Sequence, residues 1–347
     1  MVLEAVVAER SPLSLAELAR RLELPKSSVL NICTTLVSER MLLRGQDGSY
    51  RLGSKIVELG AVVSDREQSI TLIGLSVQDD ANPFFHAEIA AAAEEAGHIG
   101  ARLDARHAGY DSKLQDAQVR GFVDAGAEII VVDPVNSQSL AGAAEYARVN
   151  GVTTVAINGA ASGFDAAVTT DNTQAGFLAA SYLGRRFPNG AGVAIIDGTR
   201  VTAIADRIDG FTRALAERGG FTILSHVTGD NTEGGGYLAA TKVLAEHPDV
   251  EALFAINDPT ACGASRACRD LGVSIPIVGV DGSREAVAEI SAGRGIVATV
   301  AQDPYALARS GVRFALNLAF GARPTNHVLL LPTQLITSTD VGEYQPW

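Results

Sequence analysis

The chain has 347 residues, of which 47% are hydrophobic, and its formal net charge is −12 at pH 7. This length can bury two or three cores of ordinary domain size, and no apolar run is long enough to cross a membrane. The first residues show no basic leader followed by a long apolar core, so the sequence predicts no signal peptide.

The three cysteines predict neither a metal site nor a disulfide framework. Cys33, Cys262 and Cys268 have no metal-ligand spacing, and their number is odd. Free cysteines are among the most buried residue types, so we expect inert thiols in packed cores. A reducing compartment fits this usage, and we expect a cytoplasmic protein with no membrane partner.

The charge is spread unevenly along the chain. Residues 1–60 contain 8 lysines and arginines and 7 acidic residues, whereas the remainder contains 20 basic and 33 acidic residues. The acidic remainder would repel nucleic acid, and only the first sixty residues could tolerate a phosphate backbone.

Two helical patterns joined by a tight turn lie within the first sixty residues. Ser14 stands three residues before Glu17, which is a capping box that opens LAELARRLEL. Pro25 ends this stretch and precedes KSSVLNICTTLVSERM, which has an apolar stripe opposite short hydroxyl and amide side chains. Such a pair is typical of a helix-turn-helix, whose second helix lies in the major groove.

A predicted β-hairpin follows, because LLR and SYRLG flank a turn-rich connection at 45–48. The hairpin would carry two arginines as a wing over the phosphates. The alternative is a small helical interaction module whose arginines are only solvated. The predicted groove contacts are Ser27, Ser28, Asn31, Thr34 and Thr35, and the predicted phosphate contacts are Lys26, Arg44 and Arg51.

From Val2 to about Leu59 the chain resembles the winged helix-turn-helix of IclR-type transcription regulators, through SLAELARRLELPKSSV and GSYRLGSKIVELG. The resemblance implies a DNA-binding domain at 1–63 that includes a linker helix over 55–63, followed by a linker at 64–70. IclR-type regulators normally continue into an effector domain of a different fold from the one expected here.

After residue 70, apolar strand-like runs alternate with helix-like stretches, which predicts the α/β class with parallel sheets. Ligands of such sheets bind beyond the carboxyl ends of the strands. The polar or aromatic residues at those ends are Asn82 with Phe84 and Phe85, Asp133, Asn158, Asp197, Asn257 with Asp258, Asp281 and Gln302. This gathering of polar groups favours a pocket for a polyol.

From about Ile70 to Ile336 the chain resembles periplasmic sugar-binding proteins of the ribose-binding type and the effector domains of lactose-repressor-like regulators. The resemblance implies a two-lobed type I periplasmic-binding-protein-like domain at 71–347. Lobe one would hold about 71–172 plus 304–330, and lobe two about 173–303 plus the C-terminal segment. The ligand-binding residues so predicted are Asn82, Phe84, Phe85, Asp133, Asn158, Arg207, Asn231, Asn257, Asp281 and Gln302.

The same resemblance implies roles for some of these residues. The two phenylalanines would stack on the sugar, Arg207 would fork onto its ring and anomeric oxygens, and Asp281 would accept two vicinal hydroxyls. Asn257 would contact the sugar, with Asp258 capping the next helix.

A purely structural explanation stays open for each of these residues. The phenylalanines could be ordinary packing residues, the strand-end asparagines and aspartates could be helix caps or turn residues, and Arg207 could pair with Asp206 or Asp209.

The chain departs from the sugar-binding pattern at two places. Asn158 and Gly159 stand where Asp-Arg is normal, and Asn231 stands where an aromatic residue is typical. These changes put the identity of the ligand in doubt, although not its class.

Signals for catalysis are absent from the sequence. No glycine-rich segment has dinucleotide or P-loop spacing after a strand, no Gly-x-Ser-x-Gly elbow occurs, and the six histidines show no paired spacing for a metal. We therefore predict no enzyme activity, no cofactor and no metal.

Together these patterns predict a cytoplasmic transcription regulator, in which a small sugar or polyol alters the affinity of a homodimer for operator DNA. The alternative is a sugar-binding protein of a transport system, with an incidental helical leader.

Overall fold

The computed structural model describes residues 1–9, 12–45, 47–56, 58–59 and 69–347. It divides into two compact units, Met1–Ser69 and Ile70–Trp347. Parts of the predicted linker helix at 55–63 and most of the predicted linker at 64–70 lie outside the described residues. None of the helices that the structure describes has the length and hydropathy needed to span a bilayer.

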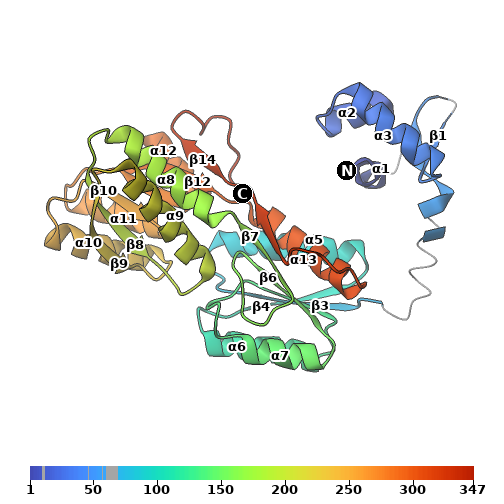
Figure 1. Cartoon of the computed structure of the whole chain (residues 1–347), viewed down its shortest axis with the longest axis horizontal. Coiled ribbons are helices and arrows are strands. Elements are labelled where there is room, and N and C mark those ends of the chain that lie inside the picture. Colours follow the sequence, from blue (N-terminus) through green and yellow to red (C-terminus); the bar gives the residue numbers. More distant parts are fainter. Residues whose placement is uncertain (10–11, 46, 57, 60–68) are drawn as a thin grey trace. The chain divides into compact units, whose positions relative to one another are not determined.

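The first unit contains the predicted helix pair and hairpin (Figure 1). The hydroxyl of Ser14 accepts a hydrogen bond from the Glu17 amide, so the predicted capping box is present. Leu18, Val29 and Cys33 are fully buried between the helices. The elements are α1 (Val2–Ala8), α2 (Leu15–Arg21), α3 (Lys26–Ser38), β1 (Leu42–Arg44) and β2 (Tyr50–Leu52), and the two strands pair antiparallel.

The second unit contains two six-stranded sheets, each covered by helices on both faces (Figure 1). The central strands are buried on both faces, which explains why they are continuous apolar runs rather than alternating ones. The predicted α/β class with two lobes and parallel sheets is therefore confirmed.

The first sheet has the strand order β13-β7-β6-β5-β3-β4, with every pair parallel. Helices α5 and α13 cover one face, and α6 and α7 cover the other. The strands are β3 (Leu72–Val77), β4 (Arg102–His107), β5 (Ile129–Val132), β6 (Thr153–Ile157), β7 (Ala166–Thr170) and β13 (Val328–Leu331), and the helices are α5 (Pro83–His98), α6 (Ser112–Asp124), α7 (Ala141–Val149) and α13 (Pro304–Ala319).

The second sheet has the order β14-β12-β11-β10-β8-β9, and only the edge strand β14 is antiparallel to its neighbour. Helices α8 and α9 cover one face, and α10, α11 and α12 the other. The strands are β8 (Gly192–Asp197), β9 (Thr222–Thr228), β10 (Ala252–Ala255), β11 (Ile277–Asp281), β12 (Ile296–Ala301) and β14 (Gln334–Thr337), and the helices are α8 (Asn172–Arg186), α9 (Thr202–Arg218), α10 (Glu233–Glu246), α11 (Asp258–Asp270) and α12 (Arg284–Ala292).

The chain passes between the two sheets after β7, after β12 and after β13. Many helices after strands begin with a polar N-cap whose side chain accepts a backbone N–H, such as Asn82 before α5 and Asn257 before α11. These caps stand at the carboxyl edge of a sheet, so a capping residue can also face the space between the sheets.

Helices α8 and α9 touch through their backbones. A Cβ atom on Gly176 would overlap the carbonyl oxygen of Arg207, and one on Gly210 would overlap the carbonyl oxygen of Thr173. Two glycines therefore set the distance between these helices, and that distance fixes where the Arg207 side chain starts.

We expect Gly176→Ala to destabilise the second unit, because the added methyl group forces α9 away from α8. Overpacking of this kind costs about 1–3 kcal/mol, which lowers the melting temperature by several degrees in a domain of this size. The matched control is Gly97→Ala in α5, where the new Cβ meets nothing within 4 Å. Alanine should be neutral or stabilising there, and equal losses in both variants, measured by calorimetry, would contradict the interpretation.

Candidate ligand-binding site and DNA-binding surface

A cavity lies between the carboxyl-edge loops of the two sheets in the second unit. Its volume is about 40 Å³, and it shares three lining residues, Asn82, Tyr110 and Asn231, with a chamber of about 390 Å³. The inner cavity is lined by Gln78, Asn82, Phe84, Phe85, Tyr110, Asn158, Val201, Ala203, Ile204, Arg207, Asn231, Ile256, Asn257, Asp281 and Gln302.

The structure brings nearly all of the predicted ligand-binding residues to this one cavity. Only Asp133 is not part of the lining, and it lies directly behind two lining residues, Gln78 and Asn158. The strand-end Asp197 is not at the cavity, because it pairs with His226 at 2.8 Å. That the lining residues contact a ligand stays a prediction.

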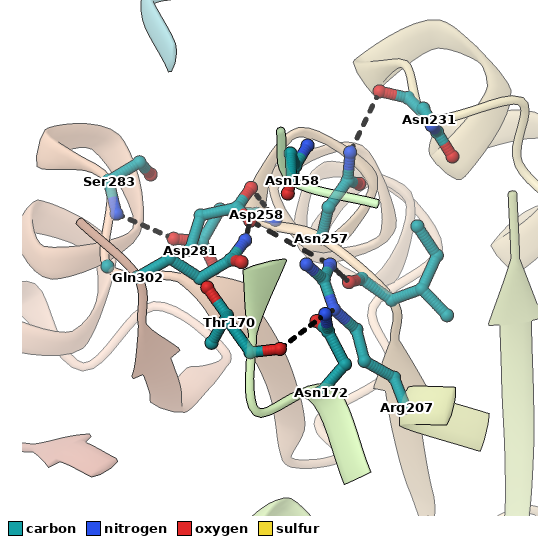
Figure 2. Close-up of polar contacts among 12 residues, drawn as sticks. Asn158, Thr170, Asn172, Arg207, Asn231, Asn257, Asp258, Asp281, Ser283 and Gln302 are labelled. Carbon is teal, nitrogen blue, oxygen red and sulfur yellow. Dashed lines mark hydrogen bonds and ion pairs between the residues drawn. The ribbon is translucent and has the colours of Figure 1, made fainter. Parts of the chain in front are cut away.

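Arg207 is the cation of the cavity wall, and Figure 2 shows it directed at the ends of the neighbouring strands. Its side chain is about 5% exposed, with Nε donating to Asn172 Oδ1 and Nη1 to the Ile256 carbonyl oxygen, both at 2.7 Å. Burial lowers the pKa of Arg207, although the nearby Asp281, at 3.9 Å, opposes this effect.

The alternative pairing of Arg207 with a carboxylate on its own helix is not present. Asp209 instead pairs with Arg213 at 2.9 Å, and no ion pair joins Asp206 to Arg207 within the described residues. The guanidinium is therefore held towards the cavity.

Two neighbouring aspartates lie at the ends of β10 and β11. The carboxylate of Asp281 accepts from Gln302 Nε2 at 2.8 Å and from the Asp258 amide at 3.3 Å (Figure 2). Asp258 accepts from the Ser283 amide and from Thr299 Oγ1, both at 2.7 Å. Burial raises the pKa of Asp281 to about 6, and burial together with Asp281 raises that of Asp258 well above its ordinary value.

The predicted helix cap at Asp258 is wrong. Asn257 is the N-cap of α11 and accepts from the Thr260 amide, whereas Asp258 is the first helical residue and does not cap. An Asn-Asp pair at a strand end offers two possible caps, and the extended backbone of Asn257 selects the first. Asn257 still lines the cavity, and its Nδ2 donates to the Asn231 carbonyl oxygen at 3.1 Å.

The capping and packing alternatives hold for some lining residues and fail for others. Asn82 caps α5, and Phe84 and Phe85 are almost fully buried in the core between α5 and its sheet, yet all three also line the cavity. The caps of α12 and α13 are Ser283 and Asp303. Asp281 and Gln302 are therefore not explained as helix caps.

A second carboxyl pair lies behind the other side of the cavity, and the sequence did not reveal it. Asp133 accepts from Gln78 Nε2 at 2.7 Å and from Asn158 Nδ2 at 3.0 Å. Glu88 of α5 is fully buried, and its carboxyl has no donor from the described residues. Because Glu88 also lies against Asp133, one proton shared between the two carboxyls is the arrangement that satisfies both.

The pKa values of this pair follow from burial. Burial raises the pKa of Asp133 to about 7, although hydrogen bonds from Gln78 and Asn158 oppose the shift. Burial and the neighbouring Asp133 raise the pKa of Glu88 well above its ordinary value. The signal for Glu88 in the sequence is one acidic residue, four positions after Phe84, on the apolar face of α5.

Backbone strain gathers at the same cavity. Seven described residues other than glycine have positive φ, and four of them line the cavity: Tyr110 (57°), Asn158 (61°), Asn231 (61°) and Asp281 (137°). Such conformations cost about 1–3 kcal/mol each and persist where the surrounding structure imposes them. Their concentration here is an independent indication of a functional site.

The segment that ends in Trp347 connects the two lobes beside the cavity. The Trp347 ring meets Phe84 edge to face, with centroids 5.3 Å apart, and its Nε1 donates to the Asp281 carbonyl oxygen at 3.2 Å. Tyr344 donates to the Gly282 carbonyl oxygen at 3.0 Å. One indole therefore touches a side chain of the first lobe and a backbone group of the second.

The predicted DNA-binding residues share one property, which is exposure to solvent in the first unit. Two of them have partly used their hydrogen-bonding capacity: the hydroxyls of Thr34 and Thr35 donate to carbonyl oxygens one turn earlier in α3. These two hydroxyls can then only accept hydrogen bonds from DNA, whereas the amide side chain of Asn31 can both donate and accept them. The exposed residues are Lys26, Ser27, Ser28, Asn31, Thr34, Thr35, Arg44 and Arg51.

We expect the second unit to lose stability as the pH rises from about 4 towards 7. The folded pKa values of Asp133, Glu88, Asp258 and Asp281 are raised, so the folded state holds protons that the unfolded chain has already released. Glu88→Leu should raise the melting temperature at pH 8 by a few degrees and flatten this decline, since it removes a buried acid.

The control for this experiment is Glu94→Gln on the same helix, where the side chain is exposed. Its melting temperature should follow the parent protein from pH 5 to pH 8. If Glu88→Leu kept the full decline, or melted lower at pH 8, the shared proton would be refuted.

Each of the two units contains a segment that matches a known domain family. Residues 73–323 match the periplasmic binding protein domain, and residues 1–45 match the IclR helix-turn-helix domain. The ribose import binding protein RbsB of Bacillus subtilis is 30% identical over 72% of this chain and 82% of its own length. The D-ribose/D-allose-binding protein of Pseudomonas aeruginosa is 30% identical over 66% of this chain and 75% of its own length.

Among solved structures, the Caulobacter myo-inositol binding protein bound to myo-inositol is similar with a TM-score of 0.74 and 26% identity, covering 81% of this chain and 97% of that one. A solute binding protein of Mycobacterium smegmatis with bound glycerol gives 0.73 and 28%, covering 78% and 96%. The predicted hybrid architecture is confirmed: the chain belongs to the periplasmic binding protein family and carries a segment that matches the IclR helix-turn-helix domain.

Proposed function

We propose that this protein is a cytoplasmic transcription regulator that binds operator DNA and responds to a small sugar or polyol. The observation that carries the proposal is the presence, in one chain, of a helix-turn-helix with an exposed polar face and of a polar cavity between two lobes. In this proposal residues 1–63 form the DNA-binding domain and residues 71–347 the sensing domain.

The chemistry of the cavity supports a hydroxyl-rich guest. Arg207 supplies charged donors, Asp281 and Gln302 supply acceptors, and Phe84 and Phe85 supply ring surfaces that suit the apolar face of a sugar. Relatives and similar structures are named for ribose, allose, myo-inositol and glycerol, which are all small polyols. The predicted ligand contacts, with Asp133 acting from behind the wall, belong to this proposal.

The proposed mechanism depends on differential binding. A guest that contacts both lobes favours the arrangement in which the lobes are closed around it. In a homodimer, closure would change the angle between two DNA-binding domains and thereby the fit to two half-sites.

A transport role is the second candidate, because several relatives are named import binding proteins. Such a protein would bind sugar and ignore DNA. The match of residues 1–45 to the IclR helix-turn-helix domain favours the regulator.

We expect the full chain to shift duplex DNA from the region upstream of its own gene in an electrophoretic assay. Arg51→Ala should weaken binding to all sequences and lower the slope of log affinity against log salt by about 1, since one phosphate contact is lost. Asn31→Ala should instead reduce the preference over random DNA. Arg148→Ala, which removes an exposed arginine paired with Glu145 in the second unit, is the control.

If Arg148→Ala weakened DNA binding as much as Arg51→Ala does, the binding would be nonspecific electrostatic attraction. A chain that ignored DNA at low salt, with and without sugars, would favour the transport role.

Trp347 is the single tryptophan of the chain, so its fluorescence should report guest binding. We expect at least one of ribose, allose, myo-inositol and glycerol to change its emission and raise the melting temperature. Asp281→Asn should abolish both effects, because the cavity loses its charged acceptor. Asp197→Asn, a strand-end carboxylate outside the cavity, is the control and should keep them. Responses retained by Asp281→Asn would refute the assigned site.

A further inference from the structure

Three amide side chains of the cavity have an orientation that the neighbouring carboxylates impose. Gln78 and Asn158 donate their N–H groups to the two oxygens of Asp133, and Gln302 donates to Asp281. The reverse orientation would set a carbonyl oxygen against a carboxylate oxygen, so these three amides cannot flip without repulsion.

This orientation leaves the three carbonyl oxygens without donors. Gln78 Oε1, Asn158 Oδ1 and Gln302 Oε1 are buried and have no hydrogen-bond partner from the described residues. The side chains of Gln78 and Gln302 are more than nine-tenths buried, and both line the cavity. A buried acceptor without a hydrogen bond is unfavourable, so a guest that donates to these oxygens gains affinity.

The charges at the two ends of the cavity differ. Near Gln302, the carboxylate of Asp281 has Arg207 at 3.9 Å. At the other end, no ion pair joins Asp133 to a basic side chain in the described part of the chain, and the buried Glu88 adds a second acid behind it. The corner formed by Gln78, Asn158 and Asp133 therefore combines two acceptors that have no donor with an acid that has no cation at contact distance among the described residues, since Arg207 acts on Asp133 only from farther away.

We propose that the guest carries a protonated amine, so that it is an amino sugar or amino polyol whose ammonium group lies beside Gln78 and Asn158. An ammonium has three N–H donors and no acceptor, which matches two carbonyl oxygens backed by a carboxylate. The ammonium group would be the counter-charge for Asp133 at this end of the cavity, as Arg207 is for Asp281 at the other end. This inference rests on the proposed sensing function and names the chemical class of the guest.

A neutral polyol is the competing guest, since its hydroxyls can also donate to the same oxygens. It would bring no cation to the negative charge that the Asp133 and Glu88 pair keeps when one proton is shared between them. The two guests therefore differ in their dependence on the Asp133 charge.

The test uses the full chain at pH 7 and matched pairs of sugars: glucosamine, galactosamine and mannosamine against glucose, galactose and mannose, with the N-acetyl derivatives as uncharged controls. Affinities come from calorimetry and from Trp347 fluorescence. At least one amine should bind tenfold or more tightly than both its neutral parent and its N-acetyl form.

Variants then locate the ammonium. Asp133→Asn should reduce the amine-to-parent ratio to nearly one; the readout is this ratio, because the substitution also disturbs the Gln78 and Asn158 amides that face either guest. Glu88→Gln leaves the Asp133 charge in place and should keep the preference, as should the control Asp197→Asn. A preference that survives Asp133→Asn overturns the assignment.

The remaining outcomes separate this inference from the proposed function. If neutral sugars, ribose, allose or myo-inositol bind as tightly as the amines, the proposal of an amine-bearing guest is refuted and the proposed sensing function is retained. If neither amines nor neutral polyols bind, both the amine and the sensing function are refuted.

Discussion

Buried carboxyl groups dominate the physics of the second unit, because four of them lie at or behind one cavity and each needs a donor, a counter-charge or a proton. Asp258 takes backbone and hydroxyl donors, and Asp281 takes an amide and lies near Arg207. Asp133 takes two amides and leaves Glu88 to share a proton. The orientations of the surrounding amides, and thus the hydrogen-bonding pattern offered to a guest, follow from these requirements.

The order of elements and the position of the cavity were accessible from the sequence because of one geometric rule. Parallel strands end at the same edge of a sheet, so polar residues that follow apolar runs gather in space. Asn82, Asn158, Asn257, Asp281 and Gln302 meet at the cavity for this reason. The rule does not select among strand ends, and Asp197 follows the same pattern yet pairs with a histidine elsewhere.

Other features depend on interactions that no local pattern encodes. Glu88 lies on the apolar face of α5, but the helix pattern does not show that packing on the sheet buries this acid beside a second carboxyl group, Asp133. Tyr110 is brought to the cavity by a left-handed turn after β4. That Asn257 and not Asp258 caps α11 rests on backbone torsions, which residue types at a strand end do not determine.

The contact between α8 and α9 has a mechanical consequence. Asn172 is the first residue of α8, immediately after the chain leaves the first sheet, and it is clamped by Arg207 through a 2.7 Å hydrogen bond. The glycine contact holds the rest of the two helices together. The cavity wall is therefore joined directly to the crossover segment between the two sheets, through one side chain and one hydrogen bond. If a guest draws the lobes together as proposed, contact with the guanidinium would act on this segment without any intermediate residue.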